Sequence, residues 1–158
     1  MQEDNDARFF LSNTQQFSVR SSILLIHRQS LLLENDAPEV YVPGGAIHFN
    51  ETAEQAILRE AQEELGIALS GPEFAGVLES FWDRDTMQFH QLTMIFRQRV
   101  DDVLFNHLQH LNYDHLDVSA QAKMVWYPLT EAARIIQPRK MITFTALGTP
   151  LRHEVERD

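Results

Sequence analysis

Short apolar runs separated by polar breaks dominate the chain, and this pattern predicts a protein rich in β-strands. The run Ile23–Ile26 is apolar at four consecutive positions, which is typical of a strand buried on both faces. Leu31–Leu33 follows after a short polar break, so the two runs are expected to form a hairpin. Strands are expected at residues 17–27, 31–33, 40–42, 74–80, 89–99 and 124–127, with residues 82–85 connecting the fourth strand to the fifth.

One segment has a helical pattern with clear ends, from Ala53 to Leu65. Thr52 and Gln55 fit a capping box at its start, and Gly66 stands where a C-terminal glycine cap belongs. The apolar positions expected to pack on the sheet are Ile57, Leu58, Ala61 and Leu65.

The other segments complete the prediction of a single domain over residues 1–158. Residues 102–119 are expected to form a loop with a helical turn around 104–111, and residues 130–137 a helix. Strands on both sides of one central helix favour a mixed α/β sandwich over regular βαβ repetition. Frayed ends are expected at about residues 1–8 and 152–158.

Composition and charge exclude several functions. The 158 residues include 23 acids and 13 Lys or Arg, so the net charge is −10. This balance argues against nucleic-acid binding, which requires a basic face. The absence of cysteine excludes disulfides, thiolate metal sites and cysteine nucleophiles. No apolar run is long enough to span a bilayer, and residues 1–10 lack the order of a signal peptide, so no membrane contact and a cytoplasmic location are expected.

Three glutamates stand close together near the end of the expected helix. At 100° per residue, Glu63 lies about 60° to one side of Glu60, and Glu64 about 40° to the other. Like charges at this spacing disfavour a helix, and Arg59 is the only nearby base. A hard divalent cation is therefore the expected partner, because Mg²⁺ and Mn²⁺ prefer oxygen ligands. A solvated acidic face is the alternative.

The spacing around these glutamates matches a known signature. Its positions are Gly45, Glu51, Arg59-Glu60-Ala61, Glu63-Glu64 and Gly66-Ile67. At every defined position this stretch resembles the Nudix box, the signature of the Nudix (MutT-like) hydrolase family, and the resemblance is specific over residues 43–67. It implies a Nudix-type α/β/α sandwich around a mixed β-sheet, and cleavage of a pyrophosphate bond in a nucleoside diphosphate linked to another group.

The resemblance also implies roles for residues of the box. The implied metal ligands are Glu60, Glu63, Glu64, Glu51 and the backbone carbonyl of Gly44 or Gly45. Mg²⁺ is the implied cofactor and Mn²⁺ its substitute. Arg59 matches the arginine that orients the carboxylates, and Glu51 could pair with Arg59 instead of binding a further metal.

Catalysis is expected from Glu60, Glu63 and Arg59. A bound metal lowers the pKa of a water molecule, and a glutamate within reach takes the water's proton. Within the box we favour Glu60 as this base. The acids outside the box that could serve instead are Glu79, Asp83, Asp85, Asp114 and Asp117.

Aromatic and basic residues outside the box are candidates for binding substrate. Trp82 could stack on a nucleobase, with Phe81 and Phe89 beside it, and core packing is the alternative. The arginines that could bind phosphate are Arg20, Arg84, Arg97 and Arg99, with surface solvation as the alternative for each. Of all these residues, Arg20, Trp82 and Arg84 are the predicted substrate-binding set.

Two functions compete on these grounds. The first is a Mg²⁺-dependent pyrophosphohydrolase acting on a small-molecule nucleoside diphosphate derivative, of the nucleotide or nucleotide-sugar type. The second is a catalytically silent nucleotide-binding module of the same fold, against which the intact box argues. Isomerisation of an isoprenoid diphosphate needs a cysteine, and the chain has none. Many members of the resembled family dimerise, so a homodimer is compatible with either function.

Overall fold

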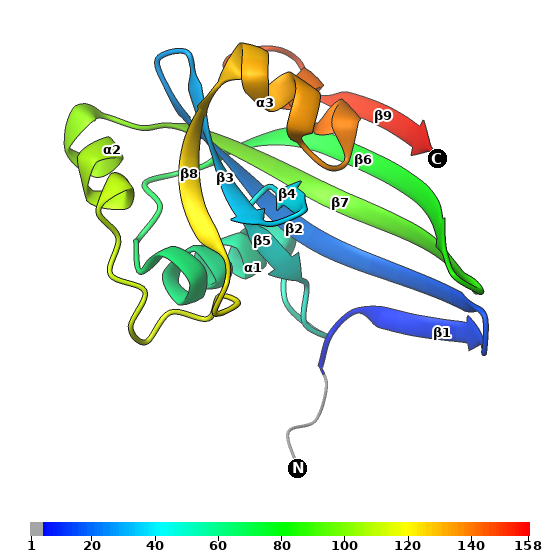
Figure 1. Cartoon of the computed structure of the whole chain (residues 1–158). Helices are drawn as coiled ribbons and strands as arrows, with labels where there is room; N and C mark the ends of the chain where they lie inside the picture. The colour runs from blue at the N-terminus through cyan, green and yellow to red at the C-terminus, as the bar shows by residue number, and fades with distance from the viewer. Residues whose placement is uncertain (1–4) are drawn as a thin grey trace.

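The computed structural model describes residues 5–158, and these residues form a mixed sheet with helices packed against it (Figure 1). Its strands are β1 (Arg8–Ser12), β2 (Gln15–His27), β3 (Ser30–Asp36), β4 (Glu39–Tyr41), β5 (Gly44–Ala46), β6 (Glu73–Arg84), β7 (Met87–Arg99), β8 (Lys123–Pro128) and β9 (Arg152–Arg157). The order is β4-β3-β2-β7-β6-β9, while β1 and β5 also pair with β2, and β8 pairs with β3.

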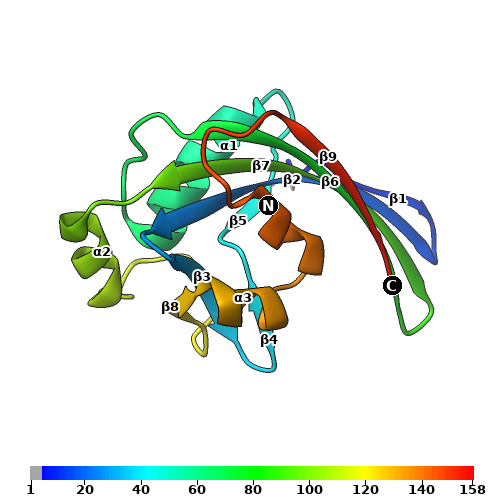
Figure 2. The ribbon, with the colours of Figure 1, turned by 90° about the horizontal axis from the view of Figure 1, so that it is seen from above.

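Helices cover both faces of this sheet, which gives three layers (Figure 2). Helix α1 (Ala53–Glu60) and its π-helical continuation η1 (Ala61–Leu65) lie on one face. Helix α3 (Leu129–Ile135) and the 3-10 helix η2 (Arg139–Phe144) lie on the other. The expected α/β/α sandwich around a mixed sheet is therefore confirmed.

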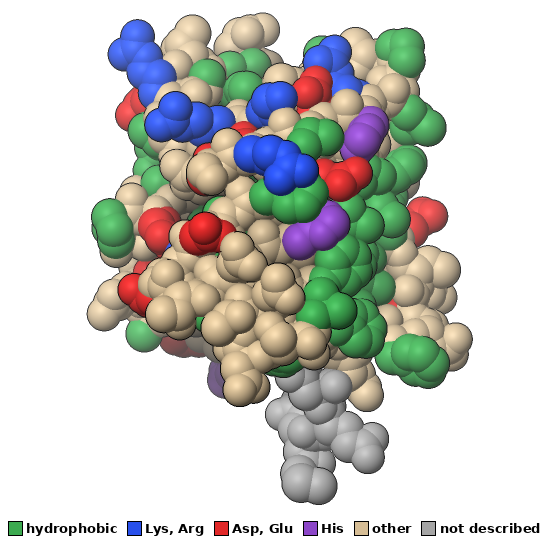
Figure 3. Space-filling view, turned by 90° about the vertical axis from the view of Figure 1, so that its right-hand side faces the viewer, with side chains coloured by type: hydrophobic (Ala, Val, Ile, Leu, Met, Phe, Trp, Pro, Cys, Tyr) green, Lys and Arg blue, Asp and Glu red, His purple; other side chains and the backbone are tan. Residues whose placement is uncertain are grey.

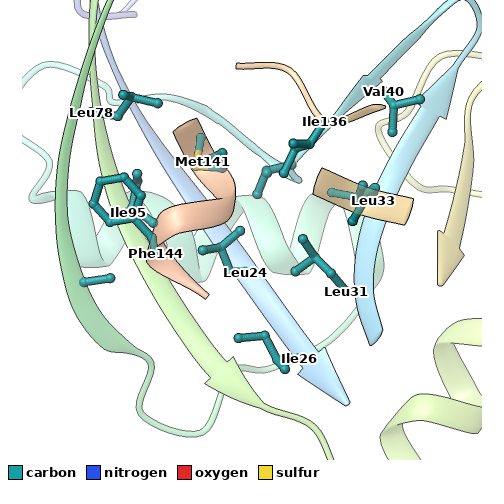
Figure 4. Close-up of a cluster of buried hydrophobic side chains, with 13 residues drawn as sticks. Leu24, Ile26, Leu31, Leu33, Val40, Leu78, Ile95, Ile136, Met141 and Phe144 are labelled. Atoms are coloured by element: carbon teal, nitrogen blue, oxygen red, sulfur yellow. The ribbon is translucent and has the colours of Figure 1, made fainter. Parts of the chain in front are cut away.

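Strand β2 lies at the centre because its apolar run serves both faces. Ile23–Ile26 are at most 4% exposed. Ile23 and Leu25 belong to the hydrophobic cluster under α1, whereas Leu24 and Ile26 belong to the cluster under α3 and η2 (Figure 4). Strand β2 pairs in parallel with β7 along twelve residues and forms an antiparallel hairpin with β3. The predicted buried strand and its hairpin are thus confirmed.

The predicted connection at residues 82–85 is wrong. Strands β6 and β7 continue as an antiparallel pair to Arg84 and Met87, with the turn at residues 85–86. Trp82 lies directly opposite Phe89, and their rings stack with centroids 4.9 Å apart. Cross-strand aromatic pairs stabilise a hairpin, and this stacking explains why the strands run past the polar residues Asp83 and Arg84.

The frayed ends predicted for the chain are also corrected. Residues 152–157 form strand β9, which pairs in parallel with β6 and so satisfies backbone groups along its edge. At the other end, Arg8 begins β1 and Asp6 forms a β-bridge with His48, while residues 1–4 lie outside the described part.

The segment expected to be a loop contains a full helix. Helix α2 (Asp102–Gln109) begins before the predicted turn, because the Asp101 carboxylate accepts a hydrogen bond of 2.8 Å from the Leu104 backbone N–H. Only the part after α2 forms irregular backbone and turns, up to β8.

The surface is mixed in character. Lys and Arg side chains gather in the upper part of the face shown in Figure 3, and hydrophobic side chains form a strip beside them. Strand β1 exposes Phe9, Phe10 and Leu11. Among the described residues, no helix has the length and apolar character needed to cross a membrane.

Candidate active site

Helix α1 and the π-turn that follows it place the glutamates. The capping box predicted at Thr52 and Gln55 is present, and Gly66 closes the turn with φ 66°, a conformation that glycine adopts without strain. Ala56, Ile57, Ala61 and Leu65 are buried against the sheet, whereas Leu58 is 39% exposed and does not join the packing face as predicted. The helix is thus anchored at both ends.

The π-turn separates the three glutamates from one another. A wider turn does not keep the 100° spacing that the sequence argument assumed, so the carboxylates do not share one face in the same environment. The side chain of Glu60 is 12% exposed and that of Glu63 is 42% exposed, while Glu64 is buried at 9%.

Arg59 is the centre of an ion-pair network with three carboxylates. Its Nε and Nη2 donate to Glu51 at 2.8 and 3.0 Å, and its Nη1 donates to Glu60 at 2.6 Å and to Glu63 at 3.2 Å. Nη2 also donates to the Ala46 carbonyl at 3.0 Å, which ties the helix to β5. These hydrogen bonds hold the pKa of Glu51 below its ordinary value and raise that of Arg59.

Glu64 is turned toward β5 and lies outside the Arg59 network. Its Oε2 accepts a hydrogen bond of 3.4 Å from the Gly44 backbone N–H. Burial, and then the nearby charges of Glu34 and Glu60, raise the pKa of Glu64 to about 9. The surroundings of Glu64 therefore disfavour the charged form of its carboxyl group.

The two glycines allow a close approach of β5 to its neighbours. A Cβ atom at Gly45 would lie 2.2 Å from Oε1 of Glu60, and one at Gly44 would lie 2.1 Å from the Ser21 carbonyl. Side chains at these positions would displace Glu60 or the backbone of β2. The predicted role of the Gly44 carbonyl as a metal ligand stays a prediction.

The carboxylate oxygens of the glutamates are suitable ligands for a divalent cation. In this structure, however, most of these carboxylates form ion pairs with Arg59. Within residues 5–158, no three Asp, Glu or His side chains converge as a ready metal cage. Glu51, Glu60 and Glu63 point instead to one guanidinium. The buried Glu64 has a raised pKa beside Glu60, and a bound cation would relieve this repulsion. Glu63 is the most exposed of the three carboxylates that contact Arg59.

A second base, Arg20 on β2, corrects the expectation that Arg59 is the only one nearby. Arg20 pairs in register with Ala46 of β5, and its charge interacts with Glu64, Glu60 and Glu34. Burial lowers the pKa of Arg20. Its Nε is shielded from solvent, and the guanidinium makes no hydrogen bond or ion pair with any residue between 5 and 158.

Arg20 lines a cavity of about 560 Å³ on the α3 side of the sheet. Trp82 and Arg84 line the same cavity, so the structure brings together all three predicted substrate-binding residues. Arg84 donates to Glu39 at 3.3 Å. Ser80, 3% exposed, has a buried Oγ that no group in the described chain contacts by a hydrogen bond.

Of the remaining candidates, Phe81 and Phe89 also line the cavity, whereas Arg97 and Glu79 lie outside it. Arg97 is buried in a hydrogen-bonded network with Glu73 and Thr149, and the Glu79 carboxylate lies 2.9 Å from His153. Of the alternative bases outside the box, Asp117 is adjacent to the glutamates, because its backbone N–H donates to the Glu63 carbonyl at 2.8 Å.

Sequence reasoning missed Glu39, Ser80 and Gln91 as cavity residues. They belong to three different strands, and no local pattern marks them. Alternation along β6 was the one available signal, since Ser80 and Trp82 are two residues apart and thus share a face of the sheet.

Known proteins share this architecture. The family model of the NUDIX domain matches residues 6–146. The low-salt glycan biosynthesis protein Agl8 of Haloferax volcanii is 31% identical over 108 residues, which are 63% of this chain and 68% of that protein. The mutator MutT protein of Bacillus halodurans has a similar structure, with a TM-score of 0.65, 15% identity, and coverage of 88% of this chain and 89% of that one.

Two further solved structures share the fold. The MutT NUDIX hydrolase of Burkholderia pseudomallei gives a TM-score of 0.51 at 21% identity, covering 87% of this chain and 91% of that chain. The Ap4A hydrolase of C. elegans gives a TM-score of 0.51 at 17% identity, and the match covers 81% of this chain and 92% of that chain. With the family model spanning most of the chain, and Glu51, Glu60 and Glu63 of the box paired with Arg59, this chain belongs to the NUDIX family of hydrolases that act on diphosphate bonds.

Proposed function

We propose that the protein is a Mg²⁺-dependent pyrophosphohydrolase of a nucleoside diphosphate linked to another moiety, of the nucleotide or nucleotide-sugar type. The observation that carries this proposal is the position of Arg20. Its guanidinium lines the 560 Å³ cavity without a hydrogen bond or ion pair to residues 5–158, and its charge interacts with Glu60 and Glu64. An anionic diphosphate would supply hydrogen-bond acceptors for Arg20, beside the carboxylates that would hold the metal.

Glu60, Glu63 and Glu64, with Glu51 beside them, are the residues that would hold Mg²⁺, and Mn²⁺ would substitute for it. When bound, the cation lowers the pKa of a water and stabilises negative charge on the leaving phosphate. Family members generally use divalent metals, which supports this assignment.

The chain's own side chains position the reactants. Arg59 keeps Glu51 and Glu60 oriented, and Glu60 accepts the proton of the attacking water. Arg20 binds a phosphate oxygen, and Trp82 packs against the group in the cavity, with Arg84 beside it. The relative from Haloferax volcanii is named for glycan biosynthesis, which supports a nucleotide-sugar type of substrate. We place this reaction in the cytoplasm.

The test is product release from a panel of nucleotides and nucleotide sugars with Mg²⁺. We expect hydrolysis of at least one member, and a loss of about a hundredfold or more in Glu63→Gln, since a charged ligand is lost. Glu54→Gln is the matched control, because Glu54 is an exposed glutamate in the first turn of the same helix.

Two results would count against the proposal. Near-normal turnover in Glu63→Gln would overturn the metal assignment. Tight nucleotide binding without products, in a folded protein saturated with Mg²⁺, would favour the silent nucleotide-binding module instead.

A further inference from the structure

We propose that the end of the cavity far from Arg20 selects a neutral, hydroxyl-bearing sugar, with Asp158 and Glu39 as the specificity-determining residues. This inference rests on the proposed function, in which the diphosphate lies at Arg20. It concerns the group at the other side of the diphosphate and the charge that this group carries.

The registers of the strands define the two ends of the cavity. Arg20 lies opposite Thr93, which lies opposite Leu78 of β6, so these residues form one row across the sheet. Ser80 is two residues further along β6 and Arg84 is six residues further. The cavity therefore extends along β6, away from the row of Arg20 and toward the β6–β7 turn.

Carboxylates dominate the far end of this cavity. Glu39, Glu156 and Asp158 all line it, and Arg84 is the one cation among the lining residues there. Arg84 is already paired with Glu39 at 3.3 Å. An additional phosphate or carboxylate on the bound group would thus meet negative charge with no free cation to offset it.

The three carboxylates differ in whether their oxygens already accept hydrogen bonds from the protein. Glu156 accepts hydrogen bonds from the backbone N–H groups of Arg139 and Lys140, at 3.1 and 2.7 Å. The Asp158 side chain has no hydrogen bond or ion pair with the part of the chain that the structure describes. Asp158 is therefore the acceptor free to bind a hydroxyl group.

Trp82 is the aromatic group at this end of the cavity, and it offers a face for the sugar ring. The neighbouring polar groups are not available to the sugar in the same way. The Ser80 Oγ is shielded from solvent. Gln91, opposite Ser80 on β7, is already bonded at both ends of its amide, to Ser18 and to Thr93.

The test compares UDP-glucose with UDP-glucuronate, two ligands that differ at one sugar carbon and by one negative charge. Binding is followed by the fluorescence of Trp82 in a Trp126→Phe background, since Trp126 is the other tryptophan of the chain. We expect UDP-glucose to bind at least about tenfold more tightly than UDP-glucuronate. UDP alone is expected to bind more weakly than UDP-glucose, since it lacks the sugar.

Variants assign the effect to the named residues. Asp158→Asn and Glu39→Gln should each reduce the ratio of the affinities for UDP-glucose and UDP-glucuronate. In the double variant the two affinities should differ by no more than about threefold. Glu131→Gln, an exposed glutamate of α3, is the matched control and should change neither affinity.

The outcomes separate the two proposals. Equal affinity for both sugars, or tighter binding of UDP-glucuronate, overturns the inference. Equal binding of UDP and UDP-glucose also overturns it and places the nucleoside in the cavity. A preference for UDP-glucose with no hydrolysis of any substrate supports the inference and rejects the proposed function. Hydrolysis of other nucleotides with no binding of either nucleotide sugar supports the proposed function and rejects the inference.

Discussion

Two arginines on neighbouring strands have opposite surroundings. Arg97 on β7 is 1% exposed and makes five hydrogen bonds, two to Glu73 and three to Thr149 and the Phe144 carbonyl. Arg20, on the adjacent strand β2, has a shielded Nε and makes no hydrogen bond or ion pair with residues 5–158, although its charge interacts with Glu64 and Glu60. A buried charge is tolerated when it is fully paired. Arg97 is thus a structural residue, and Arg20 is available for a ligand.

The comparison predicts the largest effect on stability at Arg97. Arg97→Met should lower the free energy of unfolding by about 3 kcal/mol or more, because it leaves the Phe144 and Thr149 carbonyls without their donor. For a chain of this length the melting temperature should fall by roughly 6–12 °C. Calorimetry measures it, and an unchanged melting temperature would show that the Arg97 network contributes nothing to the fold.

Arg20→Met should reduce activity and leave stability nearly unchanged, which is the opposite of the result expected for Arg97→Met. We expect kcat/KM for the best substrate of the panel to fall about 10- to 100-fold, since a charge-assisted hydrogen bond to phosphate is lost. Melting temperature should change little, because Arg20 makes no hydrogen bond or ion pair with residues 5–158. Steady-state kinetics beside calorimetry tests both halves, and a large loss of stability would make Arg20 a structural residue like Arg97.

The smallest effect concerns the pH dependence of the Arg97 pair. Hydrogen bonds from Arg97 hold the pKa of Glu73 below its ordinary value. The pair therefore stabilises the fold above the ordinary carboxyl pKa, and this contribution is lost as pH falls through the lowered value. Urea unfolding of wild type and Glu73→Gln should differ most near pH 7 and converge below about pH 4. A constant difference across this range would contradict the assignment.

The sequence alone does not predict which arginines are paired, because their partners lie far away along the chain. From the sequence, Arg20 and Arg84 were selected over Arg97 and Arg99 as phosphate-binding residues, although no local pattern shows which arginine is paired in the fold. Their partners lie at large sequence separations, such as Glu73 and Thr149 for Arg97, and no local pattern pairs them. Only the fold shows which guanidinium is already satisfied.

Segments with local signals were predicted well. The capping box, the glycine cap, the buried strand β2 and its hairpin with β3 all depend on residues close in sequence, and the structure has each of them. The long β6–β7 hairpin and strand β9 were missed, because a cross-strand aromatic pair and a distant strand edge stabilise them.

By itself, the sequence determined the family, the three-layer fold and the group of residues that surrounds Arg59, because a helix brings residues three and four positions apart onto neighbouring positions. The tertiary structure decided how those charges are distributed. A π-turn buries Glu64 while leaving Glu63 exposed, and strand pairing brings Arg20, Ser80 and Arg84 to one cavity. Both depend on contacts between segments far apart in the chain, where burial and pairing of charge are set by the whole fold.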